Sequence, residues 1–185
     1  MKKILFSFAM MIISTSHFAH ADEYSDTQKM FVDGGAQTYF TEAYGYALFP
    51  TIGKGGIGIG GSYGEGKVYQ QGNYVGNTSM AQITVGLQMG AQAFSQVIFF
   101  QDERSFTEFT SGNFEFGAQA TAVALTAGIS AEATTKGSAA GISGGKNNAN
   151  LIGQYSKGMA VFTIAKGGLM YEASLGGQKF TYKAK

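Results

Sequence analysis

The chain contains no cysteine, and its two histidines, His17 and His20, both lie close to the N-terminus. Without cysteine the protein has no disulfide bond, no thiolate metal ligand and no acceptor for the N-terminal lipid of a bacterial lipoprotein. If the N-terminal stretch is removed, the commonest general base and metal ligand is missing as well. Catalysis by a Ser-His-Asp or Cys-His arrangement is then excluded. We therefore expect a protein that is not an enzyme and needs no cofactor and no metal.

The N-terminal stretch has the pattern of a secretory signal peptide. Two lysines precede an apolar run over residues 4–13, and Ala19-His20-Ala21 offers the small-x-small pattern of a cleavage site. The apolar run is shorter than the ~20 residues that a membrane-spanning helix needs, which disfavours a transmembrane anchor. The sequence predicts a signal peptide over residues 1–21, with Asp22 as the first mature residue. The mature protein is then expected in the periplasm, associated with the outer membrane, or secreted.

Charge is sparse and nearly balanced after the signal peptide. Removing its two lysines leaves 11 of the 13 basic residues against 12 acidic ones. A general affinity for nucleic acid needs a basic surface, so we expect no nucleic-acid partner. Residues 22–44 hold five of the acids and a single lysine, whereas residues 45–185 are net basic. Residues 22–185 are long enough for one domain with its own core, and we expect a single domain there.

Glycine and aromatic residues are abundant, with 28 glycines and 14% aromatic residues against one proline, Pro50. Glycine and aromatics combined with alternation favour β sheet over disorder. Over residues 81–93 the odd positions are apolar and the even positions are Gln, Thr or Gly, which predicts a two-faced strand. The tetrapeptide Gln70-Gln71-Gly72-Asn73 separates two strand-like segments and predicts a hairpin turn.

Two segments depart from the strand pattern. Residues 22–44 carry an apolar stripe at helical spacing, interrupted by Gly34-Gly35, which predicts one or two short helices leading into the main body. Residues 102–109 place acids at the start of a further short helix that stops before Gly112. Residues 136–150 are rich in Gly, Ser and Asn and predict a mobile loop. We expect a mainly β (α+β) fold, with an antiparallel sandwich or barrel-like sheet, a helical N-terminal segment and one inserted helix.

Two glycine-rich patterns partly match nucleotide-binding motifs. Residues 53–61 contain the spacing GxGxxG twice, but Ile57 and Ile59 continue a period-two pattern where a dinucleotide site needs a helix. Residues 61–68 resemble a P-loop until Val68, which replaces the Ser or Thr that would hold magnesium. Both runs are therefore interpreted as glycine-rich strand.

Isolated charged residues are the remaining candidates. The carboxylates of Glu65, Glu115, Glu132 and Glu172 could in principle pair for acid-base chemistry, but each is alone among strand residues and is interpreted as a solvated strand position. Lysines recur beside glycines, as strand ends favour by default, and they could also form a shared anion-binding rim. The candidates for contact with a lipid or an anion are Lys54, Lys67, Lys166 and Lys179.

Four ordered segments resemble the SYLF domain family. They are residues 44–66 (YGYALFPTIGKGGIGIGGSYGEG), 85–94 (VGLQMGAQAF), 114–118 (FEFGA) and 166–175 (KGGLMYEASL). The resemblance extends over roughly residues 28–182. It implies a lipid-binding domain, since eukaryotic members bind phosphoinositide membranes and some regulate actin. Residues 22–44 are acidic where those members have a basic amphipathic segment, and actin lies in another compartment from an exported chain.

The resemblance and the predicted export together imply a bacterial envelope protein that binds phospholipid or a membrane surface non-covalently, without actin as a partner. Burial of an acyl chain would contribute more than a few surface lysines, so an apolar contact is expected to dominate. Two other classes fit the composition. A small integral outer-membrane β-barrel would share the glycine, the aromatics and the alternation. A structural or adhesive envelope protein would need no ligand.

Overall fold

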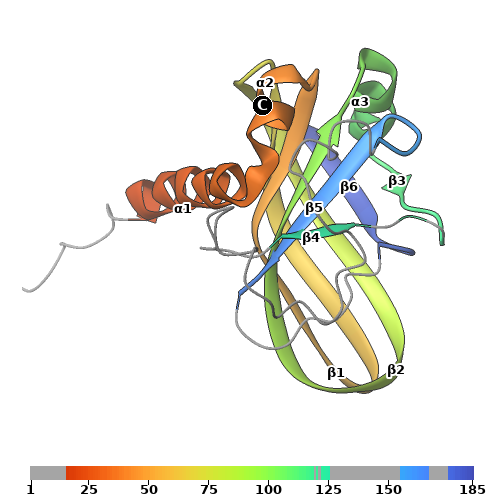
Figure 1. The fold of residues 1–185 in the computed structure, drawn as a ribbon. Coiled ribbons are helices and arrows are strands. Elements are labelled where there is room, and N and C mark those ends of the chain that lie inside the picture. The colour runs from red at the N-terminus through yellow and green to blue at the C-terminus, as the bar shows by residue number, and fades with distance from the viewer. Residues whose placement is uncertain (1–15, 119, 121, 126–154, 167–174) are drawn as a thin grey trace, which may run out of the picture.

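The computed structural model describes residues 16–118, 120, 122–125, 155–166 and 175–185, and it has the mainly β architecture that the sequence predicts (Figure 1). The predicted loop at 136–150 lies outside these residues. The elements are α1 (Ser16–Phe31), η1 (Val32–Ala36), α2 (Gln37–Glu42), β1 (Gly45–Gln70), β2 (Asn73–Phe100), α3 (Glu103–Thr110), β3 (Phe114–Glu115), β4 (Val123–Leu125), β5 (Met159–Ala165) and β6 (Lys179–Ala184).

A long antiparallel hairpin of β1 and β2 forms the frame of the molecule. Gly45 at the start of β1 pairs with Phe100 at the end of β2, and the pairing continues to the turn. Gln71 and Gly72 form this turn with φ angles of 50° and 79°. Two consecutive residues with positive φ are typical of the type I′ turn, whose twist matches that of the flanking strands. The predicted hairpin turn is confirmed.

Strand β1 bends so sharply that its two halves lie face to face. A Cβ atom added at Gly64 would lie 2.6 Å from Ile52 Cγ1, and one added at Gly66 would lie 2.7 Å from Phe49 Cδ1. Real side-chain atoms do not approach so closely, so these positions require glycine. Register shifts within β1 accompany the bend, as β-bulges usually do. The glycine-rich run is therefore strand, as predicted, and its glycines permit close packing of backbone.

The other strands extend β2 into a curled sheet, a half-barrel whose curved end lies at the bottom of Figure 1. The order is β3-β6-β2-β5-β4, with β1 on the other side of β2. Strand β6 pairs with residues 76–81 of β2, and β5 pairs with residues 94–100. All these pairs are antiparallel except β4 with β5, which is parallel. The segment at 114–116 and the strand at 159–165 appear where the sequence predicts them.

Two aromatic clusters cover the two faces of the sheet at the base of the hairpin, where β1 begins and β2 ends. On the inner face, Phe49 and Phe100 pack with Phe109 of α3 and Phe180 of β6. The outer cluster consists of buried residues from the helical segment and from β1, β2 and β5, among them Phe31, Tyr39, Leu48, Phe99 and Phe162. Burial on both faces makes the base the most stable part of the sheet.

The helical N-terminal segment packs on the outer face through Phe31, Ala36 and Tyr39, while α1 extends to one side of the sheet in Figure 1. It breaks where the sequence predicts, since Gly35 has a φ of 103° between α1 and α2. Phe31 and Ala36 on either side of the break are fully buried. Helix α1 begins at Ser16, so it extends across the predicted cleavage site after Ala21. In the part of the chain that the structure describes, no helix is long and apolar enough to cross a bilayer.

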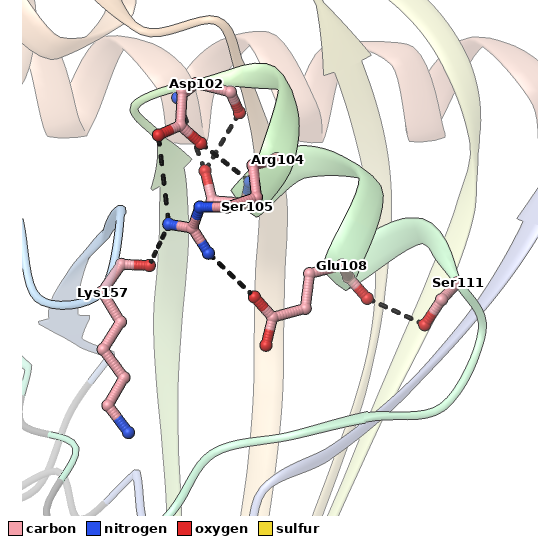
Figure 2. Close-up of polar contacts among 6 residues, drawn as sticks. All are labelled: Asp102, Arg104, Ser105, Glu108, Ser111 and Lys157. Atoms are coloured by element: carbon pink, nitrogen blue, oxygen red, sulfur yellow. Dashed lines mark hydrogen bonds and ion pairs between the residues drawn. The ribbon is translucent and has the colours of Figure 1, made fainter.

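Helix α3 is fixed by a polar network, which Figure 2 shows. The Asp102 side chain accepts a hydrogen bond from the backbone N–H of Ser105 at 2.8 Å, and this bond lowers the pKa of Asp102. Arg104 donates to the backbone carbonyl of Lys157 at 3.0 Å and forms an ion pair with Glu108 at 3.3 Å. The capping box starts the helix, and Arg104 connects it to the turn before β5.

Candidate functional site

The curved end of the hairpin inverts the usual arrangement of polar and apolar side chains. Ile57, Ile59 and Ile83, which we call the aliphatic end, are exposed by 84%, 70% and 81%. Gly61 pairs with Ile83, so Ile59 lies diagonally across from Ile83 on the same outer face. Where side-chain burial is described, the inward positions here are polar, since Ser62 is 5% and Gln82 is 7% exposed. The largest exposed aliphatic side chains among the described residues therefore gather at this end.

The inward polar row is held by hydrogen bonds. Gln82 donates to the carbonyl oxygen of Gly176 at 2.9 Å. Closer to the C-terminal end of β2, the buried side-chain amide nitrogen of Gln96 donates to the side-chain oxygen of Gln178 at 3.0 Å. Thr78 donates to the carbonyl oxygen of Thr181 at 2.7 Å. These bonds offset the cost of burying the Gln82, Gln96 and Thr78 side chains, whereas the buried Ser62 hydroxyl has no hydrogen-bond partner. At Gln82, the polar side of the strand predicted at 81–93 faces inward.

The aliphatic end is almost free of charge in sequence. No charged residue occurs from Val68 to Gln101, and the only one from Ala43 to Gly64 is Lys54. Lys54 is partly exposed in β1, opposite Gln92 and three residues before Ile57. A surface that is aliphatic, uncharged and flanked by one lysine is suited to an apolar phase.

A groove of about 750 Å³ adjoins this surface on the outer face of the sheet. It lies between the N-terminal part of α1 and the neighbouring strands β1, β2 and β6. The residues that line it include Tyr24, Tyr63, Lys67, Asn77, Thr181 and Lys183. The groove mixes aromatic rings with amides, hydroxyls and charges, so it differs in chemistry from the aliphatic end.

Lys67 occupies an unusual position in the groove. Its ammonium nitrogen lies 4.3 Å from the ring centroid of Tyr24 and 5.6 Å from that of Tyr74. The ammonium nitrogen of Lys185 also lies 5.6 Å from the ring centroid of Tyr74. Burial raises the pKa of Tyr24, and nearby Tyr69 and Glu23 raise it further. Among the described residues, no ion pair joins Lys67 to a carboxylate.

The other predicted lysines lie in different surroundings. Lys166 donates to Thr51 Oγ1 at 2.8 Å and lies 3.7 Å from Glu23, so it helps to hold the middle of α1 against β1. Lys179 is exposed on β6 and pairs with Glu115 at 3.5 Å.

The four predicted lysines therefore do not share one rim. The groove instead combines Lys67 with Lys183, which our sequence analysis missed. The alternation of Lys179, Thr181 and Lys183 along β6 is the signal that would have placed Lys183 on an outer face.

The carboxylates and glycine patterns behave as the sequence predicts where the structure describes them. Glu65 accepts a hydrogen bond from Tyr63 at 3.1 Å, which raises the pKa of Tyr63, and Glu115 pairs with β6. Glu132 and Glu172 lie outside the described residues. Residues 53–61 and 61–68 both run through β1, so neither pattern opens a helix as a nucleotide site requires.

The protein belongs to the class of mainly β proteins, with a curled, mostly antiparallel half-barrel and a helical N-terminal segment. Comparison with known proteins then identifies its family. The profile of the Ysc84 family, described as "Las17-binding protein actin regulator", matches residues 81–185. The chain belongs to this family of SYLF domains. It is also similar to "Beta cell expansion factor A" of Aeromonas veronii, with 29% identity over 147 residues, which cover 78% of this chain and 48% of the relative. This chain thus spans about half the length of that relative.

Proposed function

We propose that this protein is an exported, non-enzymatic lipid-binding protein that associates with phospholipid membranes of the bacterial envelope. The observation that carries the proposal is the aliphatic end, with Ile57, Ile59 and Ile83 each at least 70% exposed. Membership of the SYLF family supports it, because lipid binding is known in that family. Large exposed aliphatic side chains on an uncharged sheet end are costly in water and are favourable in the acyl region of a bilayer.

The magnitudes favour apolar contact over electrostatic attraction. Transfer of one isoleucine side chain from water contributes about 2 kcal/mol, so three contribute roughly 6 kcal/mol before the cost of immobilisation. A lysine near an anionic surface contributes about 1 kcal/mol. Lys54 is three residues from Ile57, or about 10 Å along an extended strand, and would lie near the headgroups when the aliphatic end is inserted.

Export determines which partners the protein meets. The description of the family includes actin regulation, but an exported bacterial protein has no access to cytoplasmic actin. We therefore propose phospholipid, rather than actin, as the partner. The mature chain should begin at Asp22, and the intact mass of protein recovered from the envelope or medium tests this. A mass that includes residues 1–21 would contradict export by the predicted route.

The decisive experiment replaces the three isoleucines with residues that have the same shape as each other and differ in polarity. The variant Ile57→Thr/Ile59→Thr/Ile83→Thr keeps β-branched side chains but adds hydroxyls, and the matched control replaces the same residues with valine. In co-sedimentation with vesicles of phosphatidylethanolamine and phosphatidylglycerol, the threonine variant should bind at least tenfold more weakly, because it loses most of the apolar term. The valine control loses only one methylene per residue, about 0.8 kcal/mol each at full burial, so it should bind more weakly than the unchanged protein but clearly more tightly than the threonine variant.

Salt gives a second readout. Binding should fall only modestly between about 50 and 500 mM salt, because screening acts on exposed charges far more than on buried apolar contacts.

Equal binding by the threonine and valine variants would exclude the aliphatic end as the membrane contact. Folding that requires detergent would favour the integral β-barrel, and no binding to any envelope lipid would favour the structural or adhesive protein. A reproducible hydrolytic activity lost in Glu65→Gln would contradict a non-enzymatic protein.

A further inference from the structure

The groove beside α1 contains two lysines and two carboxylates, and no carboxylate lies within ion-pair distance of either lysine in the described part of the chain. Of its two carboxylates, Glu23 accepts from Thr51 and lies near Lys166, while Glu65 accepts from Tyr63. Lys67 and Lys183 both line the groove, and in the described part of the chain neither forms an ion pair. The ammonium of Lys67 is held in place by the Tyr24 ring at 4.3 Å. The groove thus offers an incoming anion one positioned cation, Lys67, and a second, exposed lysine, Lys183.

The same groove offers an aromatic face and a row of polar groups. Tyr63 is 57% exposed, and the hydrogen bond from its hydroxyl to Glu65 fixes the direction of the ring. Asn77 accepts from Tyr74 through its amide oxygen, which leaves its two amide N–H donors directed elsewhere. Thr181 and Ser79 exchange a hydroxyl hydrogen bond at 2.7 Å. An exposed ring beside hydroxyl and amide groups matches a sugar, whose C–H face packs on the ring while its hydroxyls bond the polar row.

The groove begins beside the aliphatic end and extends away from it. Tyr63 pairs with Ala81, so it lies diagonally across from Ile83, whereas Lys67 is eight residues from Ile59, or roughly 26 Å along the strand. On a strand tilted by about 45°, Lys67 would be about 18 Å above the inserted isoleucines. Headgroup layers add only about 5 to 8 Å to each side of the hydrocarbon. If the aliphatic end enters the bilayer, as the proposed function states, the groove lies in the headgroup layer at Tyr63 and projects beyond it at Lys67.

We propose that this groove binds an anionic sugar, with Lys67 and Lys183 on its acidic group and Tyr63 under its ring. Such a sugar can be free in solution or can belong to a glycolipid in the same membrane. The inference rests on the proposed function for the height of the groove, whereas the chemistry of the groove is independent of it. The two sources share one recognition chemistry and differ in whether the sugar is membrane-bound.

The soluble arm of the experiment uses tetragalacturonate as the anionic probe and maltotetraose as the neutral one, with affinity measured by calorimetry. Tetragalacturonate should bind at least tenfold more tightly than maltotetraose. The double variant Lys67→Gln/Lys183→Gln should lose this preference, and Tyr63→Ala should weaken binding about fivefold or more. The control Lys29→Gln/Lys157→Gln makes the same charge change outside the groove and should stay within twofold. Matching thermal melts establish that each variant is folded.

The membrane arm compares phosphatidylethanolamine vesicles that carry either lipopolysaccharide or phosphatidylglycerol at equal charge. Stronger binding to the lipopolysaccharide vesicles, lost only in the groove variant, supports a membrane-bound sugar. Soluble binding without that difference supports a free sugar. Soluble binding with no vesicle binding at all supports the groove and overturns the proposed function. The inference is overturned if the groove variant and its control bind tetragalacturonate equally, or if the groove variant weakens binding to both kinds of vesicle alike.

Discussion

The base and the curved end of the β1–β2 hairpin belong to the same two strands and have opposite surroundings. At the base, residues 45–50 and 94–100 are all buried, because an aromatic cluster covers each face. At the curved end only one face is buried, and it is the polar one, while Ile57 and Ile83 face outward. Alternation along a strand therefore defines two faces but does not say which of them lies inside.

The difference has a physical cause in the layers that cover the sheet. Phe99 at the base lies 5.3 Å from the Tyr39 ring and 4.7 Å from the Phe40 ring, both in the helical segment. At the curved end, the glycines of β1 let the backbone approach itself, which leaves little inner volume for large side chains. Small and hydrogen-bonded residues fit that interior, so the isoleucines are outside. The base thus supplies stability and the curved end supplies a surface for binding.

The largest expected effect is the loss of an aromatic residue at the base. Phe99→Ala should lower the free energy of unfolding by about 3 to 5 kcal/mol, because it removes a fully buried ring between two layers. Ile83→Ala, at the curved end, should change it by less than about 0.5 kcal/mol, since the side chain is already exposed. Denaturant unfolding measures both. Similar losses from the two variants would show that the curved end is packed as the base is.

An intermediate effect is expected for the glycines that bring the halves of β1 together. Gly66→Ala places a Cβ atom 2.7 Å from Phe49 and should destabilise the protein by about 1 to 3 kcal/mol through overpacking. Gly53→Ala meets no atom within 4 Å and should be neutral or stabilise by up to about 1 kcal/mol, because alanine restricts the unfolded chain. Thermal or denaturant unfolding compares the two. Equal stability of the two variants would argue against face-to-face contact within β1.

The smallest expected effect is a dependence on alkaline pH at the base. Burial raises the pKa of Tyr46 and of Tyr155 to about 12 each, from 10.0. Between pH 10 and 12 the unfolded tyrosines ionise while the folded ones stay neutral, so stability present below pH 10 is lost as pH rises. Each should contribute a loss of about 1 kcal/mol at pH 11.

Spectrophotometric titration at 295 nm and circular dichroism follow this change together. Tyr46→Phe should remove part of the pH dependence, because phenylalanine has no group that ionises. Tyr63→Phe at the curved end is the matched control: the hydrogen bond to Glu65 raises the pKa of Tyr63, but the ring is 57% exposed and the bond is screened by solvent, so this variant should change the pH dependence of unfolding less than Tyr46→Phe does. Ionisation of all the tyrosines near pH 10 without unfolding would contradict burial at the base.

Much of the fold was predictable because its signals are local. The helical stripe with a break at Gly34-Gly35, the turn at Gln71-Gly72 and the capped helix after Asp102 all appear in the structure where the sequence places them. Each depends on a few neighbouring residues whose backbone preferences agree. The candidate site was less predictable, because Tyr24, Lys67 and Lys183 come from three distant elements that only the folded sheet brings together.

The sequence by itself determined the types of secondary structure, the positions of turns and caps, and the near absence of charge along the hairpin, because these depend on residue type and short-range spacing. Only the tertiary structure decided which face of β2 is inside, since that depends on where α1, α2 and α3 cover the sheet. It also decided that Lys67 rests on the Tyr24 ring, whereas Lys179 pairs with Glu115 on β3. The physical reason is that burial and charge pairing are properties of neighbours in space, and neighbours in space are set by how the long hairpin bends.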